Sequence, residues 1–274
     1  MSGRLSVVGT PIGNLGDLSE RARETLASAD LVAAEDTRRT GRLLAHIGVR
    51  ARMVSLHEGN EARRVDQILD RLREGAAVAL VSDAGMPAVS DPGFRLLRAA
   101  VDAGVEVSVV PGPSAVTAAL VVSGLPTDRW VFEGFLPRRA GDRRARLRAL
   151  ALDPRTIVLF ESPVRVVTLL RDVLAELGDR RVALARELTK LHEEVVRGKV
   201  SEVLASVLGS EPRGEIVVVI EGAAPTAADL DELVDEARRL VADGMRKREA
   251  AAAVARRSGG SANAIYEALV RPPI

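Results

Sequence analysis

The chain has 274 residues, of which 47% are hydrophobic and 28% are charged, and its formal net charge is +1. This balance predicts a folded protein with a buried core, and it excludes a protein coated uniformly in basic charge. The sequence has no cysteine, which excludes disulfides and thiolate metal sites. The start of the chain lacks a signal-peptide core and no apolar run is long enough to span a membrane, so we expect a soluble, cytoplasmic protein.

The first half alternates strand-like and helix-like segments, which is typical of an α/β domain with a parallel sheet. Asp17 and Glu20 are three residues apart and predict a capping box for a helix that reaches about Ala29. Residues 77–83 are almost continuously apolar, as expected for a central parallel strand. The pattern also predicts strands at 5–8, 31–35, 52–56 and 105–112, and helices at 36–48, 61–74, 94–103 and from 113 onward.

The alternation breaks at residues 123–130, where Gly124 and Pro126 indicate a domain junction. Beyond it we expect strands at 130–136, 156–162, 181–187 and 214–222, and helices at 137–148, at 163–177 and after a start at Ser201. Residues 223–229 predict a linker, and the remainder predicts three short helices that are broken at Gly244 and at 258–261. The predicted fold class is therefore α/β, with α/β domains at residues 1–123 and 124–223 and a helical tail at 229–274.

Three predicted strands are followed by loops rich in glycine, proline and small polar residues: GTPIGN at 9–14, SDAGMPAVSDPG at 82–93 and PGPSA at 111–115. Ligands of open α/β sheets bind outside the carboxyl ends of the strands. None of the loops has a Walker lysine or a dinucleotide fingerprint, and their prolines remove N–H groups that a phosphate cradle needs. Each loop alone could be a tight turn, but together they predict a cleft for a compact ligand with an adenine, a ribose and an amino-acid tail.

These loops resemble those of the S-adenosylmethionine-dependent tetrapyrrole methylase superfamily. The chain is most similar to the branch of bacterial enzymes that methylate the ribose 2′-OH of a cytidine in small-subunit ribosomal RNA. The resemblance covers nearly the whole chain, through the segments 7–22, 30–40, 80–93, 109–120, 132–138, 159–163 and 185–198. The wider superfamily has a Gly-Asp-Pro triplet in the third-strand loop, whereas this chain has Gly85, Met86 and Pro87.

The resemblance implies S-adenosylmethionine as cofactor, held in a cleft between the two α/β domains. It implies a substrate of ribosomal RNA or an assembled small subunit, and a homodimer. The cofactor contacts that it implies are Pro11, Gly85, Met86, Pro87, Val89, Asp91, Ser114, Ala115, Phe160, Glu161 and Leu188.

Methyl transfer to a ribose oxygen needs in-line alignment and an acceptor for the hydroxyl proton. The leading candidates for this catalytic role are Glu35, Asp36 and Glu133, and further candidates are Asp83, Glu161 and Glu187. Each carboxylate could instead cap a helix or form an ion pair, and Asp36 is placed to cap the helix that follows it. The three histidines show no ligand spacing, so no metal is expected.

Residues 137–148 contain six arginines and one acidic residue. This excess of positive charge predicts a site that binds RNA phosphates. The alternative is a solvated helix face without a ligand. The predicted RNA contacts are Arg38, Arg39, Arg138, Arg139, Arg143, Arg144 and Lys190. Six aromatic residues are too few for extensive base stacking, which favours recognition of RNA backbone and shape. The tail is similar to a helix-turn-helix module that could bind RNA through Arg246, Lys247, Arg248, Arg256 and Arg257, but a simple packing appendage explains it nearly as well.

Two other functions stay open at this point. A C-methyltransferase acting on a tetrapyrrole precursor would use the same cofactor cleft. A non-catalytic RNA-binding module could retain the fold without the reaction.

Overall fold

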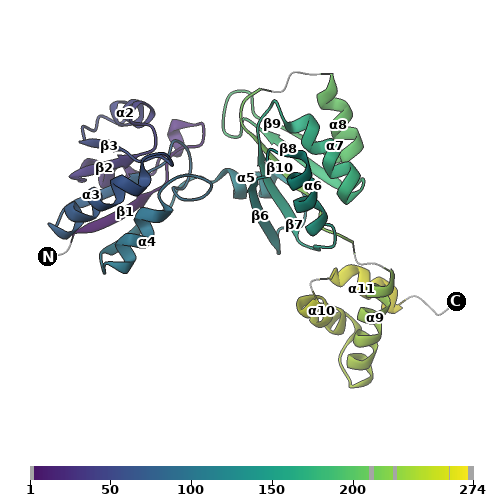
Figure 1. Cartoon of the computed structure of the whole chain (residues 1–274). Coiled ribbons are helices and arrows are strands. Elements are labelled where there is room, and N and C mark those ends of the chain that lie inside the picture. Colours follow the sequence, from purple (N-terminus) through teal and green to yellow (C-terminus); the bar gives the residue numbers. More distant parts are fainter. Residues whose placement is uncertain (1–2, 210–212, 225–226, 259, 271–274) are drawn as a thin grey trace. The chain divides into compact units, whose positions relative to one another are not determined.

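The computed structural model describes residues 3–209, 213–224, 227–258 and 260–270 (Figure 1). The chain divides into two compact units. Unit 1 comprises the chain up to Ala118 together with the segment Glu187–Glu194. Unit 2 comprises Ala119–Arg186 and the chain from Val195 onward.

Unit 1 is built on a five-stranded sheet in the order β3-β2-β4-β1-β5, and every pairing in it is parallel. Its central strand β4 is fully buried from Val78 to Val81, because helices cover both faces of the sheet, and this confirms the prediction from its apolar run. The strands are β1 (Arg4–Val8), β2 (Leu31–Ala34), β3 (Met53–Ser55), β4 (Ala77–Val81) and β5 (Glu106–Val110).

Two pairs of helices bury the two faces of this sheet. Leu26 of α1 and Leu44 of α2 pack with Val32 and Val81 on one face. Helices α3 and α4 bury the other face through a second apolar cluster, which includes Leu72 and Leu96. The helices are α1 (Glu20–Ala27), α2 (Thr37–His46), α3 (Glu61–Arg73) and α4 (Phe94–Asp102).

The start of α1 differs from the prediction. Asp17 lies in a short 3-10 turn, Leu15–Asp17, in which the Asn14 side chain accepts the Gly16 N–H. The hydroxyl of Ser19 accepts the N–H of Ala22 at 3.1 Å and caps the helix. The predicted capping box at Asp17 is therefore wrong, because the turn uses up the residues before Ser19.

Unit 2 contains a second five-stranded sheet in the order β6-β7-β10-β8-β9. β6 and β7 are parallel, whereas β10 runs antiparallel to both β7 and β8. The helices α6, α7 and α8 contribute to the apolar core of this sheet through residues such as Leu147, Leu170 and Val203. The strands are β6 (Trp130–Phe135), β7 (Thr156–Glu161), β8 (Arg181–Arg186), β9 (Glu194–Lys199) and β10 (Ile216–Ile220); the helices are α6 (Ala140–Ala149), α7 (Val166–Leu177) and α8 (Val200–Leu208). Helix α5 (Ala115–Ser123) begins in unit 1 and ends in unit 2.

The tail forms the three predicted helices, α9 (Ala227–Ala242), α10 (Lys247–Ser258) and α11 (Ala262–Val270). They share a small core of their own that includes Val234, Val254 and Ile265. Residues 225–226 of the predicted linker and residue 259 of the second predicted break lie outside the described residues. The mixed α/β fold class with a helical tail is confirmed. In the described part of the chain, no helix has both the length and the apolar character needed to cross a membrane.

Candidate active site

The loops that follow β1, β4 and β5 meet at one edge of the unit 1 sheet. Thr10 and Gly85 exchange two backbone hydrogen bonds, of 2.9 and 3.1 Å, between the first and second loops. A Cβ atom on Gly9 would lie 2.7 Å from the backbone of Gly112, so the first and third loops touch through glycine backbone. The three loops that the sequence analysis singled out therefore form one continuous wall.

A fourth segment of unit 1, Glu187–Glu194, lies against the first loop. A Cβ atom on Gly13 would lie 2.5 Å from Cγ of Lys190 and 2.9 Å from Oγ1 of Thr189, so only glycine fits beneath them. Lys190 Nζ is 2.8 Å from Glu187 Oε1. The Thr189 hydroxyl is buried and has no hydrogen-bond partner. Sequence reasoning missed Gly13 and Thr189, and the glycine within GTPIGN was the only available signal.

Backbone strain concentrates in these same segments. Among the described residues, four non-glycine residues have a positive φ: Ala88 and Ser90 in the second loop, and Glu187 and Thr189 in the fourth segment. Their φ values lie between 52° and 68°, where each side chain costs on the order of 1–3 kcal/mol. Strain of this kind persists where a specific local geometry is needed, so it points to these loops as a functional site.

Carboxylates gather at the ends of the neighbouring strands β2 and β4. The Asp83 N–H donates to Glu35 Oε2 at 3.2 Å, and the Asp36 N–H donates to Asp83 Oδ1 at 3.0 Å. Burial raises the pKa of the Glu35 carboxyl, and the charge on Asp83 raises it further. Arg39 Nε lies 3.5 Å from Asp83 Oδ2 and partly balances the negative charge.

Asp36 is the N-cap of α2. Its Oδ1 accepts the Arg38 N–H at 2.8 Å, and the Arg38 guanidinium binds both carboxylate oxygens, at 3.2 and 2.9 Å. The side-chain hydrogen bond from Arg38 lowers the pKa of Asp36 to about 2. The alternative considered for Asp36, a helix cap, is therefore confirmed.

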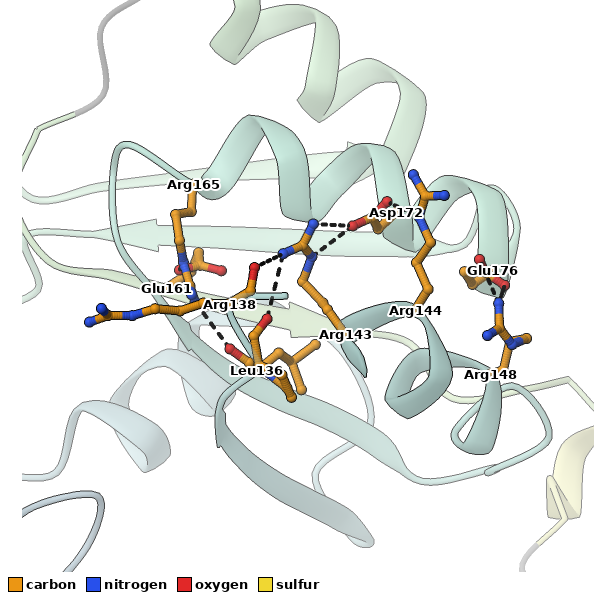
Figure 2. Close-up of polar contacts among 10 residues, drawn as sticks. Leu136, Arg138, Arg143, Arg144, Arg148, Glu161, Arg165, Asp172 and Glu176 are labelled. Atoms are coloured by element: carbon orange, nitrogen blue, oxygen red, sulfur yellow. Dashed lines mark hydrogen bonds and ion pairs between the residues drawn. The ribbon is translucent and has the colours of Figure 1, made fainter. Parts of the chain in front are cut away.

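The predicted RNA-binding arginines of α6 differ in how far they reach solvent (Figure 2). Arg143 donates from Nε and from Nη2 to Asp172 Oδ2, each at 2.7 Å, and its side chain is only 7% exposed. Arg144 is about half exposed and donates from Nε to Asp172 Oδ1 at 2.7 Å. The structure thus places the Arg143 guanidinium in the interior of unit 2, and this does not fit the predicted phosphate contact.

The remaining acidic candidates of unit 2 are also held in ion pairs. Glu133 accepts two hydrogen bonds from Arg146, at 2.6 and 2.7 Å. Glu161 is almost fully buried; its Oε1 binds Arg165 Nε at 2.7 Å, while its Oε2 has no hydrogen-bond partner.

The eleven expected cofactor contacts divide unevenly between the units. Phe160 and Glu161 belong to unit 2, and Phe160 packs against the rings of Phe132 and Phe135. The nine others belong to unit 1 and lie in the four segments described above: Pro11, Gly85, Met86, Pro87, Val89, Asp91, Ser114, Ala115 and Leu188. Among the residues that the structure describes, no group of histidine, aspartate and glutamate side chains could hold a metal ion.

The chain belongs to the family of tetrapyrrole (corrin/porphyrin) methylases, whose model matches residues 4–204. It is a methyltransferase, and its family membership confirms the expected cofactor, S-adenosylmethionine. The fold agrees with this assignment. The chain aligns with the solved structure of the methyltransferase CobJ with a TM-score of 0.62 and 21% identity, covering 81% of this chain and 95% of that one.

Two relatives carry the same name, ribosomal RNA small subunit methyltransferase I. The protein of Mycobacterium tuberculosis (strain CDC 1551 / Oshkosh) is 48% identical over 274 residues, which span 98% of this chain and 95% of the relative. The protein of Thermotoga maritima is 51% identical over 220 residues, which span 80% of this chain and 99% of the relative. About a fifth of this chain therefore has no counterpart in the Thermotoga protein.

Proposed function

We propose that this chain transfers a methyl group from S-adenosylmethionine to the ribose 2′-OH of a cytidine in small-subunit ribosomal RNA. The names of the relatives support ribosomal RNA as the substrate. The observation that carries a catalytic role is local to unit 1. Loops with a strained backbone contact the first loop, and Glu35, whose carboxyl pKa is raised, lies directly after β2 of the same sheet.

The residues present suit the cofactor. The glycines Gly9, Gly13 and Gly112 let the loops and the fourth segment pack directly on one another, which fixes the wall against which a compact ligand would lie. Within unit 1, the buried Thr189 Oγ1 has no hydrogen-bond partner and is available to a polar group of a ligand. When bound, S-adenosylmethionine supplies an electrophilic methyl group on a sulfonium.

The protein's own contribution is to hold the attacking oxygen in line and to accept its proton. Glu35 is a stronger base than Asp36, because its pKa is raised whereas that of Asp36 is lowered to about 2. Glu133 is engaged by Arg146 through both oxygens. We therefore assign the proton acceptor to Glu35, with Asp36 as the residue that orders the start of α2.

RNA contacts are proposed for cations at the start of α2, beside the first loop, and in and just before α6. Arg38 and Arg39 lie at the start of α2, with side chains that are 88% and 56% exposed. Lys190 lies beside Gly13 of the first loop. Their charges would attract phosphates without reading bases. Arg138, Arg139 and Arg144 complete the proposed set.

A methyl-transfer assay tests the proposal directly. Small ribosomal subunits, and separately their naked RNA, are purified from cells that lack this protein and incubated with it and labelled S-adenosylmethionine. We expect label in one cytidine, which becomes resistant to alkaline cleavage on its 3′ side because its 2′-OH is blocked. Transfer to a base carbon of RNA, or to a tetrapyrrole precursor and to no RNA, would overturn the proposal.

We also propose that the protein acts in the cytoplasm as a homodimer, because closed twofold assemblies are the commonest soluble oligomers. Light scattering should then give twice the chain mass of 29.1 kDa. A mass of one chain at micromolar concentration would contradict the dimer.

A further inference from the structure

The segment Phe135–Arg139, between β6 and α6, has a fixed backbone and two exposed arginines. Leu136 is buried in the core of unit 2, and Pro137 restricts the next φ angle. Arg143 Nη1 donates to the carbonyl of Arg138 at 3.1 Å and reaches that of Pro137 at 3.5 Å. Arg165 Nη2 donates to the carbonyl of Leu136 at 3.3 Å. Two guanidiniums thus hold three successive carbonyls (Figure 2).

Buried carboxylates hold these two guanidiniums in turn. Asp172, with a side chain 3% exposed, binds Arg143, and Glu161, with a side chain 1% exposed, binds Arg165. A guanidinium is planar and rigid, so a carboxylate that binds some of its N–H groups also fixes the directions of the others, which here donate to the loop carbonyls. The segment is therefore preorganised by side chains from α6 and α7.

The arginine side chains of the segment itself remain outside this network. Arg138 and Arg139 are exposed and form no ion pair in the part of the chain that the structure describes. Figure 2 shows the Arg138 side chain pointing away from the Arg143–Asp172 pair. Arg139 is the residue before α6, and no side chain caps that helix. The partial positive charge of its N-terminus adds to the two guanidiniums, and Asp142 in the first turn offsets part of it.

An exposed aromatic ring begins the same segment. Phe135 is 58% exposed, and its ring lies 5.5 Å from that of Phe160, which supports it from one side. Phe132 packs edge-on against Phe160 at 4.9 Å and completes a small aromatic cluster. A supported ring with free surface is a stacking platform for one base, and every base has a π-face.

We infer that Phe135–Arg139 binds one unpaired nucleotide of the RNA substrate. Phe135 stacks on the base, Arg138 and Arg139 contact the flanking phosphates, and Arg143 and Arg165 are positioning residues that act through the backbone. This inference rests on the proposed function, because it assigns part of the substrate site for that reaction. Among the arginines of residues 137–148, it separates the exposed contacts Arg138 and Arg139 from the buried support Arg143.

The first test changes the two exposed arginines together. Arg138→Ala/Arg139→Ala should bind a fluorescent single-stranded fragment of small-subunit ribosomal RNA on the order of tenfold more weakly. Between about 50 and 200 mM salt, the slope of log affinity against log salt should flatten by about 0.7 for each lost phosphate contact. Arg171→Ala is the matched control, because Arg171 is an exposed arginine of α7 without an ion pair in the described chain. A double variant that behaves like this control would overturn the inference.

The second test separates stacking from apolar contact. Phe135→Leu should weaken RNA binding about fivefold or more, whereas Phe135→Tyr should bind like the parent protein. Equal RNA affinity of Phe135→Leu and the parent would overturn the stacking role. A lower mass of Phe135→Leu in light scattering, with unchanged RNA affinity, would assign the ring to a protein contact instead.

The third test addresses positioning. Arg143→Lys keeps the charge beside Asp172, but a single ammonium cannot bind that carboxylate and the loop carbonyls together. We expect a raised KM for RNA, unchanged kcat at saturating RNA and unchanged affinity for S-adenosylmethionine by calorimetry. An unchanged KM for RNA in a folded variant would remove the positioning role.

These results stay distinct from a failure of the proposed function. If the parent protein methylates no RNA, the proposed reaction is wrong whatever the variants do. If the parent methylates RNA and both surface variants match it in affinity and KM, only the role of this segment is wrong.

Discussion

The Asp83 N–H donates a hydrogen bond to Glu35 Oε2, and this bond joins the carboxyl ends of β2 and β4. A second bond, from the Asp36 N–H to Asp83 Oδ1, runs in the opposite direction between the same two strand ends. The two bonds bring the Glu35 and Asp83 carboxylates together in a partly buried position. Burial and the neighbouring charge both oppose ionisation of Glu35, so this residue takes up a proton more readily than an ordinary glutamate.

Glu35→Gln should lower kcat by about 10²–10⁴-fold, the usual contribution of a general base. The glutamine oxygen can still accept the Asp83 N–H, so affinity for S-adenosylmethionine should change little. Single-turnover methyl transfer and calorimetry measure the two quantities separately. Asp36→Asn is the matched control, because asparagine also caps helices and should preserve most of the rate. Full turnover by Glu35→Gln would direct attention to Asp83 and Glu187.

Glu35 and Asp36 should affect the pH dependence of stability with opposite signs. The raised pKa of Glu35 means that its contribution is fully present below its ordinary value of 4.5 and is lost as the pH rises through the folded value. Asp36 contributes stability above its ordinary value of 3.8, and this is lost as the pH falls through about 2.

Urea unfolding at a series of pH values measures both effects. Relative to the parent protein, Glu35→Gln should gain stability as the pH rises above 4.5. The deficit of Asp36→Asn should shrink as the pH falls from 3.8 towards about 2, because the parent side chain then becomes neutral as well. A difference that does not vary with pH would contradict the environment described for that residue.

Asp172 should be a strong determinant of the stability of unit 2. Burial opposes its ionisation, but hydrogen bonds from Arg144 and Arg143 outweigh that effect and hold its pKa below the usual range. Asp172→Ala would leave the Arg143 charge buried and unpaired, which typically costs about 3–5 kcal/mol. Chemical denaturation should show this loss. The control Glu176→Ala, which releases the half-exposed Arg148, should lose less than about 1 kcal/mol. Equal losses would contradict the buried role of Arg143.

Gly9→Ala should separate the first loop from the third. The added Cβ would meet Gly112 backbone at 2.7 Å and Met86 Sδ at 2.8 Å, and the backbone contact cannot be relieved by a rotamer change. Displacement of a reacting group by about 1 Å can cost on the order of 10²-fold in rate. Methyl-transfer kinetics and cofactor calorimetry check this. Gly141→Ala is the control, since a Cβ there meets nothing within 4 Å and alanine favours the helix. A fully active Gly9→Ala would show that these loops need not touch.

Local patterns predicted much of this fold. The strand β4 and the glycine- and proline-rich loops could be predicted, because the sequence signals for them lie within a few consecutive residues. The strand β9 was missed because its sequence, Glu194–Lys199, alternates charge with only partly buried valines. The cap of α1 was misplaced because Asp17 lies within a 3-10 turn that Asn14 caps, and Ser19 caps the helix that follows.

Long-range partners account for the rest of what sequence alone did not show. Arg143 looks like its exposed neighbours in the sequence, and only Asp172, 29 residues away, explains its burial. The Glu35–Asp83 bond spans 48 residues. The contact of Gly13 with Lys190 joins segments that are still farther apart along the chain. No periodicity or spacing encodes such pairs, so the sequence predicted the loops but not the contacts between them.

The membership of Glu187–Glu194 in unit 1 has a consequence for biosynthesis. A ribosome that has just completed Ala118 has made every strand of the unit 1 sheet, but not the segment that covers Gly13. Residue 194 follows 76 residues later (194 − 118), or after about 4–15 s at translation rates of about 5–20 residues per second. During that interval the first loop has no covering segment, so the nascent chain passes through a stage in which the proposed methyl-donor site is open and incomplete.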